Sequence, residues 1–277
     1  MMAGWYSSLN ILRTFTHEVH NALKLSLKNE ALKETWIRRY SHILFSCLCA
    51  AYGSNSLCAV VSSNPLLHRP IRFGRRFIEA MNRLSERAVA ISGASILYAI
   101  EKAGGLLKAR GKKPFIILCD CLSLPEYVYL YDRFTDRVQP GALLYAINPG
   151  GKTKTFEHLA KAYLNIASEE VTMKDIAKGL QGRMEAAGWL LYRDLDDLVH
   201  RHGKEGFTSL LDLAVSLFRV VEELALKIDR LSEQYCLLVM SDHGYDVATR
   251  DGQWCLAHRF KYGELNLSLF STTILIG

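Results

Sequence analysis

The residues of this chain that could do chemistry are carboxylates and imidazoles in its carboxy-terminal half. Ser-Asp-His-Gly at 241–244 places a carboxylate beside an imidazole, and Gly244 lets the backbone turn with no side chain in the way. Asp196 and His200 are four residues apart, so on a helical turn they share one face and can bind one cation together. Mixed carboxylate and imidazole ligands suit zinc or manganese. A divalent metal site is therefore the first hypothesis.

Asp120 and His258 extend this set of metal-binding side chains. Asp120 comes directly after the apolar run 115–119, and His258 lies in Ala-His-Arg-Phe at 257–260. The sequence leaves structural explanations open for each residue. Asp120 could stabilise a turn, Asp196 could interact with a helix dipole, and His258 could be a core histidine. The Asp-His pair at 242–243 could likewise be solvated at a strand end.

The elements that must position these side chains are short apolar runs of the kind found in strands buried on both faces. Such runs lie at 115–119, 143–147, 189–192 and 236–240, and an amphipathic helical pattern covers about 208–234. Alternating strands and helices predict an α/β fold with a mostly parallel sheet flanked by helices. Ligands of such sheets bind beyond the carboxyl ends of the strands, where these polar residues fall. A last run at 267–276 is expected to close or edge the sheet.

The first 112 residues have a different pattern. Apolar residues recur there at helical spacing, as at Phe15 and Val19 and again at Phe73 and Phe77. Gly104 and Gly105, followed by the basic run 108–113, resemble a linker. We therefore expect a helical amino-terminal region over 1–112 and an α/β core over 113–277.

Composition and charge indicate a globular protein with anionic partners. Of 277 residues, 49% are hydrophobic and 22% charged, and the formal net charge is +6. Aromatic side chains interleave with a basic stretch: Arg69, Arg72, Arg75, Arg76, Arg83 and Arg87. This stretch could be a nucleic-acid contact surface or the solvated face of a helix.

The cysteines and the apolar segments bear on the compartment. An odd total of seven cysteines indicates reduced thiols in a cytoplasmic protein. A metal site at Cys47, Cys49 and Cys58 is an alternative, but these lack the paired spacing of a zinc ribbon. Polar residues interrupt the apolar stretch 43–61, and no secretory signal is evident, so we expect no membrane association.

Together, the order Asp…Thr…Asp-x-x-x-His…Ser-Asp-His-Gly…His resembles the alkaline phosphatase superfamily. Within it, the segments at 120–123, 192–200 and 239–245 resemble PglZ-domain proteins, which include components of phage-defence systems. The resemblance covers about 114 to 277 and implies an alkaline-phosphatase-like core with two metal ions, zinc or manganese. It assigns Asp196, His200 and His258 to one metal. It assigns Asp120, Asp242 and His243 to the other, together with the nucleophile.

The nucleophile suggested by resemblance is a threonine. Thr-Lys-Thr-Phe at 153–156 is similar to a stretch of nucleotide pyrophosphatase/phosphodiesterases in which the second threonine attacks, which would be Thr155, with Thr153 as the alternative. A helix amino terminus with Lys152 and Lys154 nearby suits phosphate binding, and Lys152, Lys154 or Arg259 could neutralise phosphoryl oxygens. A plain lysine-rich loop capped by Thr155 remains open.

The resemblance implies a two-metal phosphoester hydrolase, with a phosphodiesterase acting on nucleotides or oligonucleotides as the leading hypothesis. A phosphomonoesterase would use the same ligands. A different class of function also remains: a non-catalytic or regulated scaffold component of a phage-defence or signalling complex, with protein partners in place of turnover.

Overall fold

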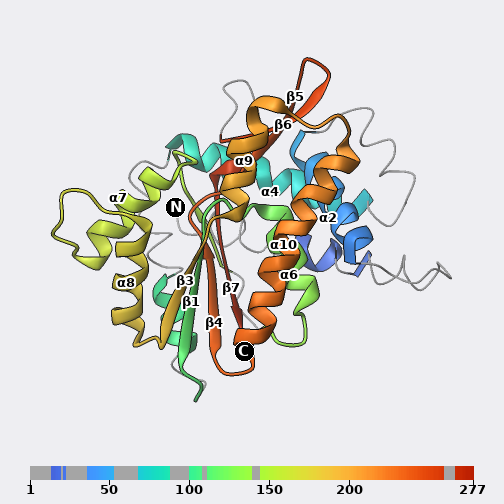
Figure 1. Cartoon of the computed structure of the whole chain (residues 1–277). Helices are drawn as coiled ribbons and strands as arrows, with labels where there is room; N and C mark the ends of the chain where they lie inside the picture. Colours follow the sequence, from blue (N-terminus) through green and yellow to red (C-terminus); the bar gives the residue numbers. More distant parts are fainter. Residues whose placement is uncertain are drawn as a thin grey trace.

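The computed structural model describes residues 14–19, 21–22, 36–52, 68–87, 100–107, 111–138, 144–258 and 266–277. Its centre is a sheet with helices on both faces (Figure 1). The strands are β1 (Pro114–Cys119), β2 (Leu144–Ile147), β3 (Gly188–Tyr192), β4 (Cys236–Ser241) and β7 (Phe270–Ile276). Their order across the sheet is β2-β7-β4-β1-β3.

Strand direction brings four strand ends to one edge of the sheet. β1 pairs in parallel with β3 and β4, while β7 is antiparallel to both β4 and β2. β1, β2, β3 and β4 therefore run the same way, as the sequence predicted. The expectation that the last run closes or edges the sheet is wrong, because β7 lies inside the sheet between β2 and β4. Every residue of β7 is buried, which suits an interior strand paired on both sides.

Helices, a hairpin and one short turn complete the described chain. The helices are α2 (Trp36–Tyr52), α4 (His68–Arg87), α6 (Leu124–Arg133), α7 (Thr153–Leu164), α8 (Met173–Met184), α9 (Asp194–Glu205) and α10 (Leu210–Ser232). Further helices cover 14–19 and 100–107. The hairpin pairs β5 (Asp246–Arg250) with β6 (Gln253–Ala257), and the 3-10 turn η3 (Leu267–Leu269) precedes β7.

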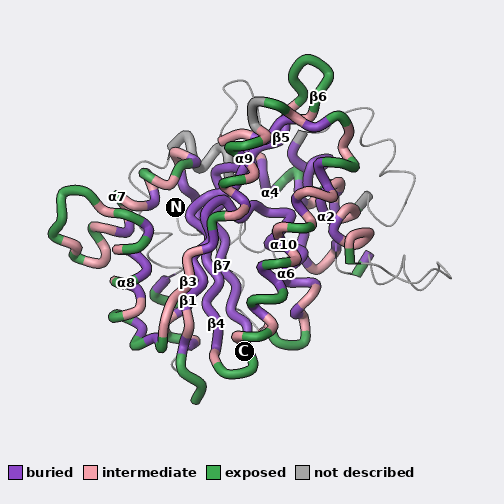
Figure 2. Tube along the Cα trace, viewed as in Figure 1, coloured by how far each residue is buried: buried purple, intermediate pink, exposed green. Residues whose placement is uncertain are grey.

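Both faces of the sheet are buried, which explains why its strands read as continuous apolar runs. Ile117 and Cys119 of β1 join a core with α2, α6 and α10, while Ile116 and Leu118 join a second core with α7 and α8. Buried residues fill most of β1 and all of β4 and β7, the edge strand β3 is half-buried, and exposed residues lie on outer helix faces and turns (Figure 2). Successive side chains of a strand point to opposite faces of the sheet. Here the two faces lead to two different cores, so the alternation along a strand does not separate buried from exposed residues.

The described amino-terminal residues are helical and pack against the α/β layer. Every described residue between 14 and 107 lies in a helix, including Gly104 and Gly105, which the sequence marked as a linker. On α4, the ring of Phe77 is fully buried and stacks on Phe270 at 5.3 Å between centroids. That ring is therefore closed to a nucleic-acid base, although the arginines at 69, 72, 75 and 76 are exposed. The side chains of Arg83 and Arg87 lie outside the described part.

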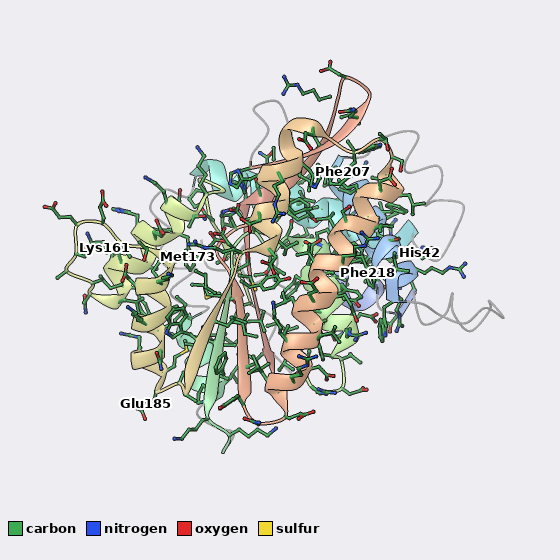
Figure 3. The ribbon with its side chains drawn as sticks, viewed as in Figure 1. His42, Lys161, Met173, Glu185, Phe207 and Phe218 are labelled. Carbon is green, nitrogen blue, oxygen red and sulfur yellow. The ribbon has the colours of Figure 1, made fainter. Side chains whose placement is uncertain are left out.

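An aromatic cluster joins α2 to α6 and α10. Phe218 of α10, labelled in Figure 3, lies 6.0 Å from the ring of Tyr40 and 6.1 Å from that of Tyr129. Within this cluster, Glu126 is fully buried, and its Oε1 accepts hydrogen bonds from Tyr40 (2.5 Å) and Tyr245 (2.6 Å). Burial raises the pKa of Glu126, and the two hydroxyl donors oppose that rise. The carboxyl group is tolerated there because it is hydrogen-bonded.

Tyr40→Phe tests this polar anchor. The substitution keeps the ring and removes one donor to a buried carboxyl group, so the free energy of unfolding in urea should fall by about 1–3 kcal/mol. Tyr163→Phe, on α7 at the opposite face of the sheet, is the matched control and should change stability by less than about 0.5 kcal/mol. Equal stability of the two variants would show that the Tyr40 hydroxyl contributes nothing to folding.

Candidate metal centre

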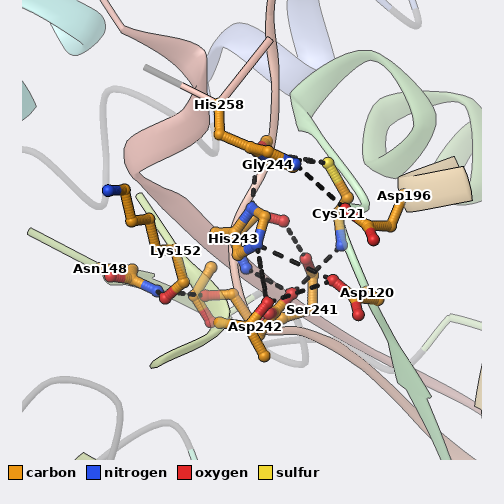
Figure 4. Close-up of polar contacts among 12 residues, drawn as sticks. Asp120, Cys121, Asn148, Lys152, Asp196, Ser241, Asp242, His243, Gly244 and His258 are labelled. Atoms are coloured by element: carbon orange, nitrogen blue, oxygen red, sulfur yellow. Dashed lines mark hydrogen bonds and ion pairs between the residues drawn. The ribbon is translucent and has the colours of Figure 1, made fainter. Parts of the chain in front are cut away.

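The carboxyl edge of the sheet gathers the carboxylates that the sequence singled out. Asp120 directly follows β1, Asp242 directly follows β4, and Asp196 lies in the first turn of α9 after β3. The last residues of β1 and β4, Cys119 and Ser241, are paired in register, so the two aspartates are next to each other. His258 comes from elsewhere, directly after β6 (Figure 4).

The first group consists of Asp120, Asp242 and His243. His243 Nε2 lies 3.3 Å from Asp242 Oδ2 and 3.8 Å from Asp120 Oδ1. All three residues are buried, and their candidate ligand atoms lie within 4.8 Å of one another. This spacing allows the three side chains to hold one cation.

The second group consists of Asp196, His200 and His258. Asp196 Oδ1 lies 3.1 Å from His258 Nε2 and 3.4 Å from His200 Nε2, as the four-residue spacing on α9 allows. His200 is exposed, whereas Asp196 and His258 are half-buried. The rings of His243 and His258 are 4.9 Å apart, so the two groups adjoin. All six residues predicted from the sequence thus come together, in the two groups that the resemblance implied.

Electrostatics at the first group favour a cation. Asp242 Oδ1 accepts hydrogen bonds from the N–H groups of Cys121 (3.1 Å) and His243 (2.8 Å), but its buried Oδ2 has no hydrogen-bond partner among the described residues. Burial raises the pKa of Asp120 to about 7, with repulsion from Asp242 as the next cause, and burial raises that of Asp242 to about 7 as well. An orphaned carboxylate oxygen beside a second carboxylate fits a divalent cation.

His243 has the protonation state that a metal ligand needs. Burial lowers the pKa of its imidazole, so the ring is neutral at pH 7. Its Nδ1 lies 2.8 Å from the carbonyl oxygen of Gly244, so Nδ1 carries the proton and Nε2 presents a lone pair to Asp120 and Asp242. Gly244 itself has no room for a side chain, because a Cβ there would lie 2.7 Å from the carbonyl oxygen of Leu267.

The structure places Thr153, and not Thr155, at this group. Thr153 begins α7, and its Oγ1 lies 3.2 Å from His243 Nε2 and 3.4 Å from Asp120 Oδ1. The hydroxyl of Thr155 packs instead against the turn at Gly150, where any Cβ would collide with it. The hydroxyl available to the candidate metal centre is therefore that of the alternative threonine.

Of the cationic residues predicted at the site, the structure describes Lys152 but not Arg259. Lys152 is the N-cap of α7, with an exposed side chain next to Thr153. Arg259 lies outside the described residues. A further cation that the sequence analysis did not name is Arg193, whose Nε lies 3.9 Å from Asp120 Oδ2.

Asn148 is a buried residue at the site that sequence reasoning missed. Its Nδ2 donates to the carbonyl oxygens of Asp242 (3.0 Å) and Lys152 (2.9 Å), and its Oδ1 accepts from the N–H of Gly150 (3.2 Å). Asn148 thereby connects the threonine loop to the Asp-His loop. The available signal was its position directly after an apolar run, like that of Asp120 and Asp242.

The hairpin that carries His258 was also missed. Asp251 and Gly252 form its turn with φ values of 51° and 77°, the positive values that a two-residue hairpin turn requires. An Asp-Gly dipeptide between two short runs is the sequence signal for such a turn.

The alternative cysteine site receives no support from the described chain. Cys47 and Cys49 are buried in α2, and neither joins a described group of side chains able to hold a metal. Cys58 lies outside the described residues.

Comparison with known proteins adds no family. No protein-family model matches the chain, and no curated protein matches it in sequence. Within the described residues, no helix combines the length and apolar character needed to cross a bilayer.

The raised pKa values predict an unusual pH dependence for metal-free protein. A carboxyl group whose pKa is about 7 when folded binds protons more tightly folded than unfolded, so deprotonation destabilises the fold. The free energy of unfolding in urea with chelator present should therefore fall as the pH rises from about 4, the pKa of an unfolded carboxyl group, to about 7, the pKa of the folded one, and the lowered pKa of His243 opposes this fall near and below about pH 6.5. Asp242→Asn should flatten this dependence. A slope unchanged in that variant would contradict the assignment.

Proposed function

We propose that the chain is a metal-dependent phosphoester hydrolase with an alkaline-phosphatase-like core of the PglZ type. The observation that carries the proposal is the position of the Thr153 hydroxyl, at a helix amino terminus and within 3.4 Å of both an aspartate and a neutral histidine. The first group of carboxylates and imidazole lies beside it, and the second group adjoins the first. This combination of a hydroxyl nucleophile and cation-binding residues is what phosphoryl transfer requires.

The residues divide between two cations. Asp196, His200 and His258 would hold one, and Asp120, Asp242 and His243 the other, with zinc or manganese fitting both donor sets. When bound, these cations supply positive charge to the phosphoryl oxygens and favour ionisation of a hydroxyl group.

Thr153 is the proposed nucleophile. Its hydroxyl loses a proton to solvent, Oγ attacks phosphorus, the P–O bond to the leaving group breaks, and the leaving oxygen takes a proton from water. Water then hydrolyses the phosphothreonine, which releases the phosphoryl product and restores the hydroxyl. Asp120 Oδ1 accepts a hydrogen bond from the hydroxyl, and Asn148 fixes the turn that precedes it. The amino terminus of α7 adds the positive end of its helix dipole beside the reacting phosphoryl group, and Lys152 adds an exposed cation.

A phosphodiester is the proposed substrate class, with nucleotides or oligonucleotides as its source. The support is the similarity of Thr-Lys-Thr-Phe at 153–156 to nucleotide phosphodiesterases, together with the net charge of +6. Phosphomonoester hydrolysis and a scaffold role in a defence or signalling complex are the outcomes against which the proposal is tested.

Hydrolysis of bis-p-nitrophenyl phosphate and of p-nitrophenyl phosphate by zinc- or manganese-loaded protein is the test. We expect metal-dependent diester cleavage that Asp242→Ala abolishes. Thr153→Ala should lower kcat by at least about 10³-fold, because it removes the nucleophile, whereas the matched Thr155→Ala should change it by less than about tenfold.

Other outcomes would redirect the proposal. Activity on the monoester alone would overturn the diesterase assignment. Loss of activity in Thr155→Ala but not in Thr153→Ala would exchange the roles of the two threonines. No hydrolysis of either ester by protein with bound metal would favour the scaffold.

A further inference from the structure

Cys121 lies behind the two imidazoles of the candidate centre. It directly follows Asp120, is fully buried, and has a φ of 70°, in the left-handed region that residues other than glycine rarely adopt. Its Sγ is 3.8 Å from His258 Nδ1 and 3.5 Å from the carbonyl oxygen of Gly244 (Figure 4). Residue 121 thus has a backbone conformation that glycine adopts more easily, yet it is a cysteine whose thiol points toward His258.

The orientation of the two rings defines what that thiol faces. The Nε2 atoms of His243 and His258 face the carboxylates of Asp242 and Asp196, at 3.3 Å and 3.1 Å. Their Nδ1 atoms therefore face away from these carboxylates. A neutral imidazole that binds a cation through Nε2 carries its proton on Nδ1, and that N–H needs an acceptor to fix the ring. Gly244 provides the acceptor for His243, at 2.8 Å.

We propose that Cys121 is the positioning residue for His258. The N–H at His258 Nδ1 donates to the Cys121 sulfur, and the thiol S–H donates to the carbonyl oxygen of Gly244. That oxygen also accepts from His243, so one thiol and one carbonyl set the orientation of both rings. The inference rests on the proposed function, because it assumes that Nε2 of each ring faces a cation.

The competing role for this sulfur is direct coordination. Cys121, His243 and His258 together could hold a thiophilic cation, since their candidate ligand atoms lie within 4.8 Å. The geometry favours positioning, because the described contacts of Sγ are with His258 Nδ1 and Gly244 and not with the Nε2 side where the carboxylates lie. A thiolate bound to Co²⁺ gives a sulfur-to-cobalt band in the near ultraviolet, whereas a thiol that only forms hydrogen bonds does not, so the two roles can be told apart.

Cation binding by Cys121 variants tests the proposal. Cys121→Gly removes the sulfur at a position whose backbone already suits glycine, so the variant should fold normally. A change in its zinc affinity would then report on the orientation of His258 and not on misfolding. It should weaken zinc binding at one of the two sites by about 10–100-fold, the usual effect of losing a partner of a metal-bound histidine. Cys121→Ser retains a donor and an acceptor and should restore most of the affinity. Cys255→Ser, on β6, is the matched control and should bind as the unaltered protein does.

The absorption spectrum of the Co²⁺ complex distinguishes a role of Cys121 at the metal centre from a merely structural one, which would leave this spectrum unchanged. The Co²⁺ complex of the unaltered protein should show visible d–d bands without a sulfur-to-cobalt band in the near ultraviolet, and ¹⁵N spectra of the zinc-loaded protein should show His258 protonated at Nδ1. A sulfur-to-cobalt band that Cys121→Ser removes would overturn positioning in favour of coordination. Unaltered zinc affinity in Cys121→Gly would overturn both roles and leave the proposed function intact. Failure of the unaltered protein to bind any cation would instead overturn the metal centre itself.

Discussion

The candidate metal centre depends on the proximity of two buried carboxylates, Asp120 and Asp242. They are neighbours because β1 and β4 are adjacent parallel strands whose last residues are paired in register. Burial and mutual repulsion raise the pKa of Asp120, and one oxygen of Asp242 has no hydrogen-bond partner in the part of the chain that the structure describes. Such a pair is unfavourable unless it is protonated or shares a cation. The side chains around this pair could hold such a cation.

The surrounding residues limit how the site can move. Asn148 links the Asp242 loop to the start of α7, and Gly244 permits the close approach of η3. Tyr245, next along the chain, donates to Glu126, which also accepts from Tyr40 of α2. A buried chain of hydrogen bonds therefore extends from the amino-terminal helices to the Asp-His loop. The amino-terminal region thus contributes to the rigidity of the site as well as to the core.

The sequence predicted the parts of this structure that follow from local patterns. Strands buried on both faces read as apolar runs, and polar residues directly after them mark the carboxyl edge. The position of β7 could not be predicted in this way, because the order of strands across a sheet depends on long-range pairing. The choice between Thr153 and Thr155 had a similar limit. Residues two positions apart, such as Thr153 and Thr155, point about 200° apart around a helix, so only one of them can face the site. The turn before α7 decides which one does.

Metal content per chain is the most direct test of the central claim. Protein loaded with zinc and then dialysed should retain two zinc ions per chain by elemental analysis. Asp196→Asn and Asp242→Asn should each retain one, since each substitution removes a carboxylate from a different group. Retention of no zinc by the unaltered protein, or of the same amount by all three proteins, would contradict the account.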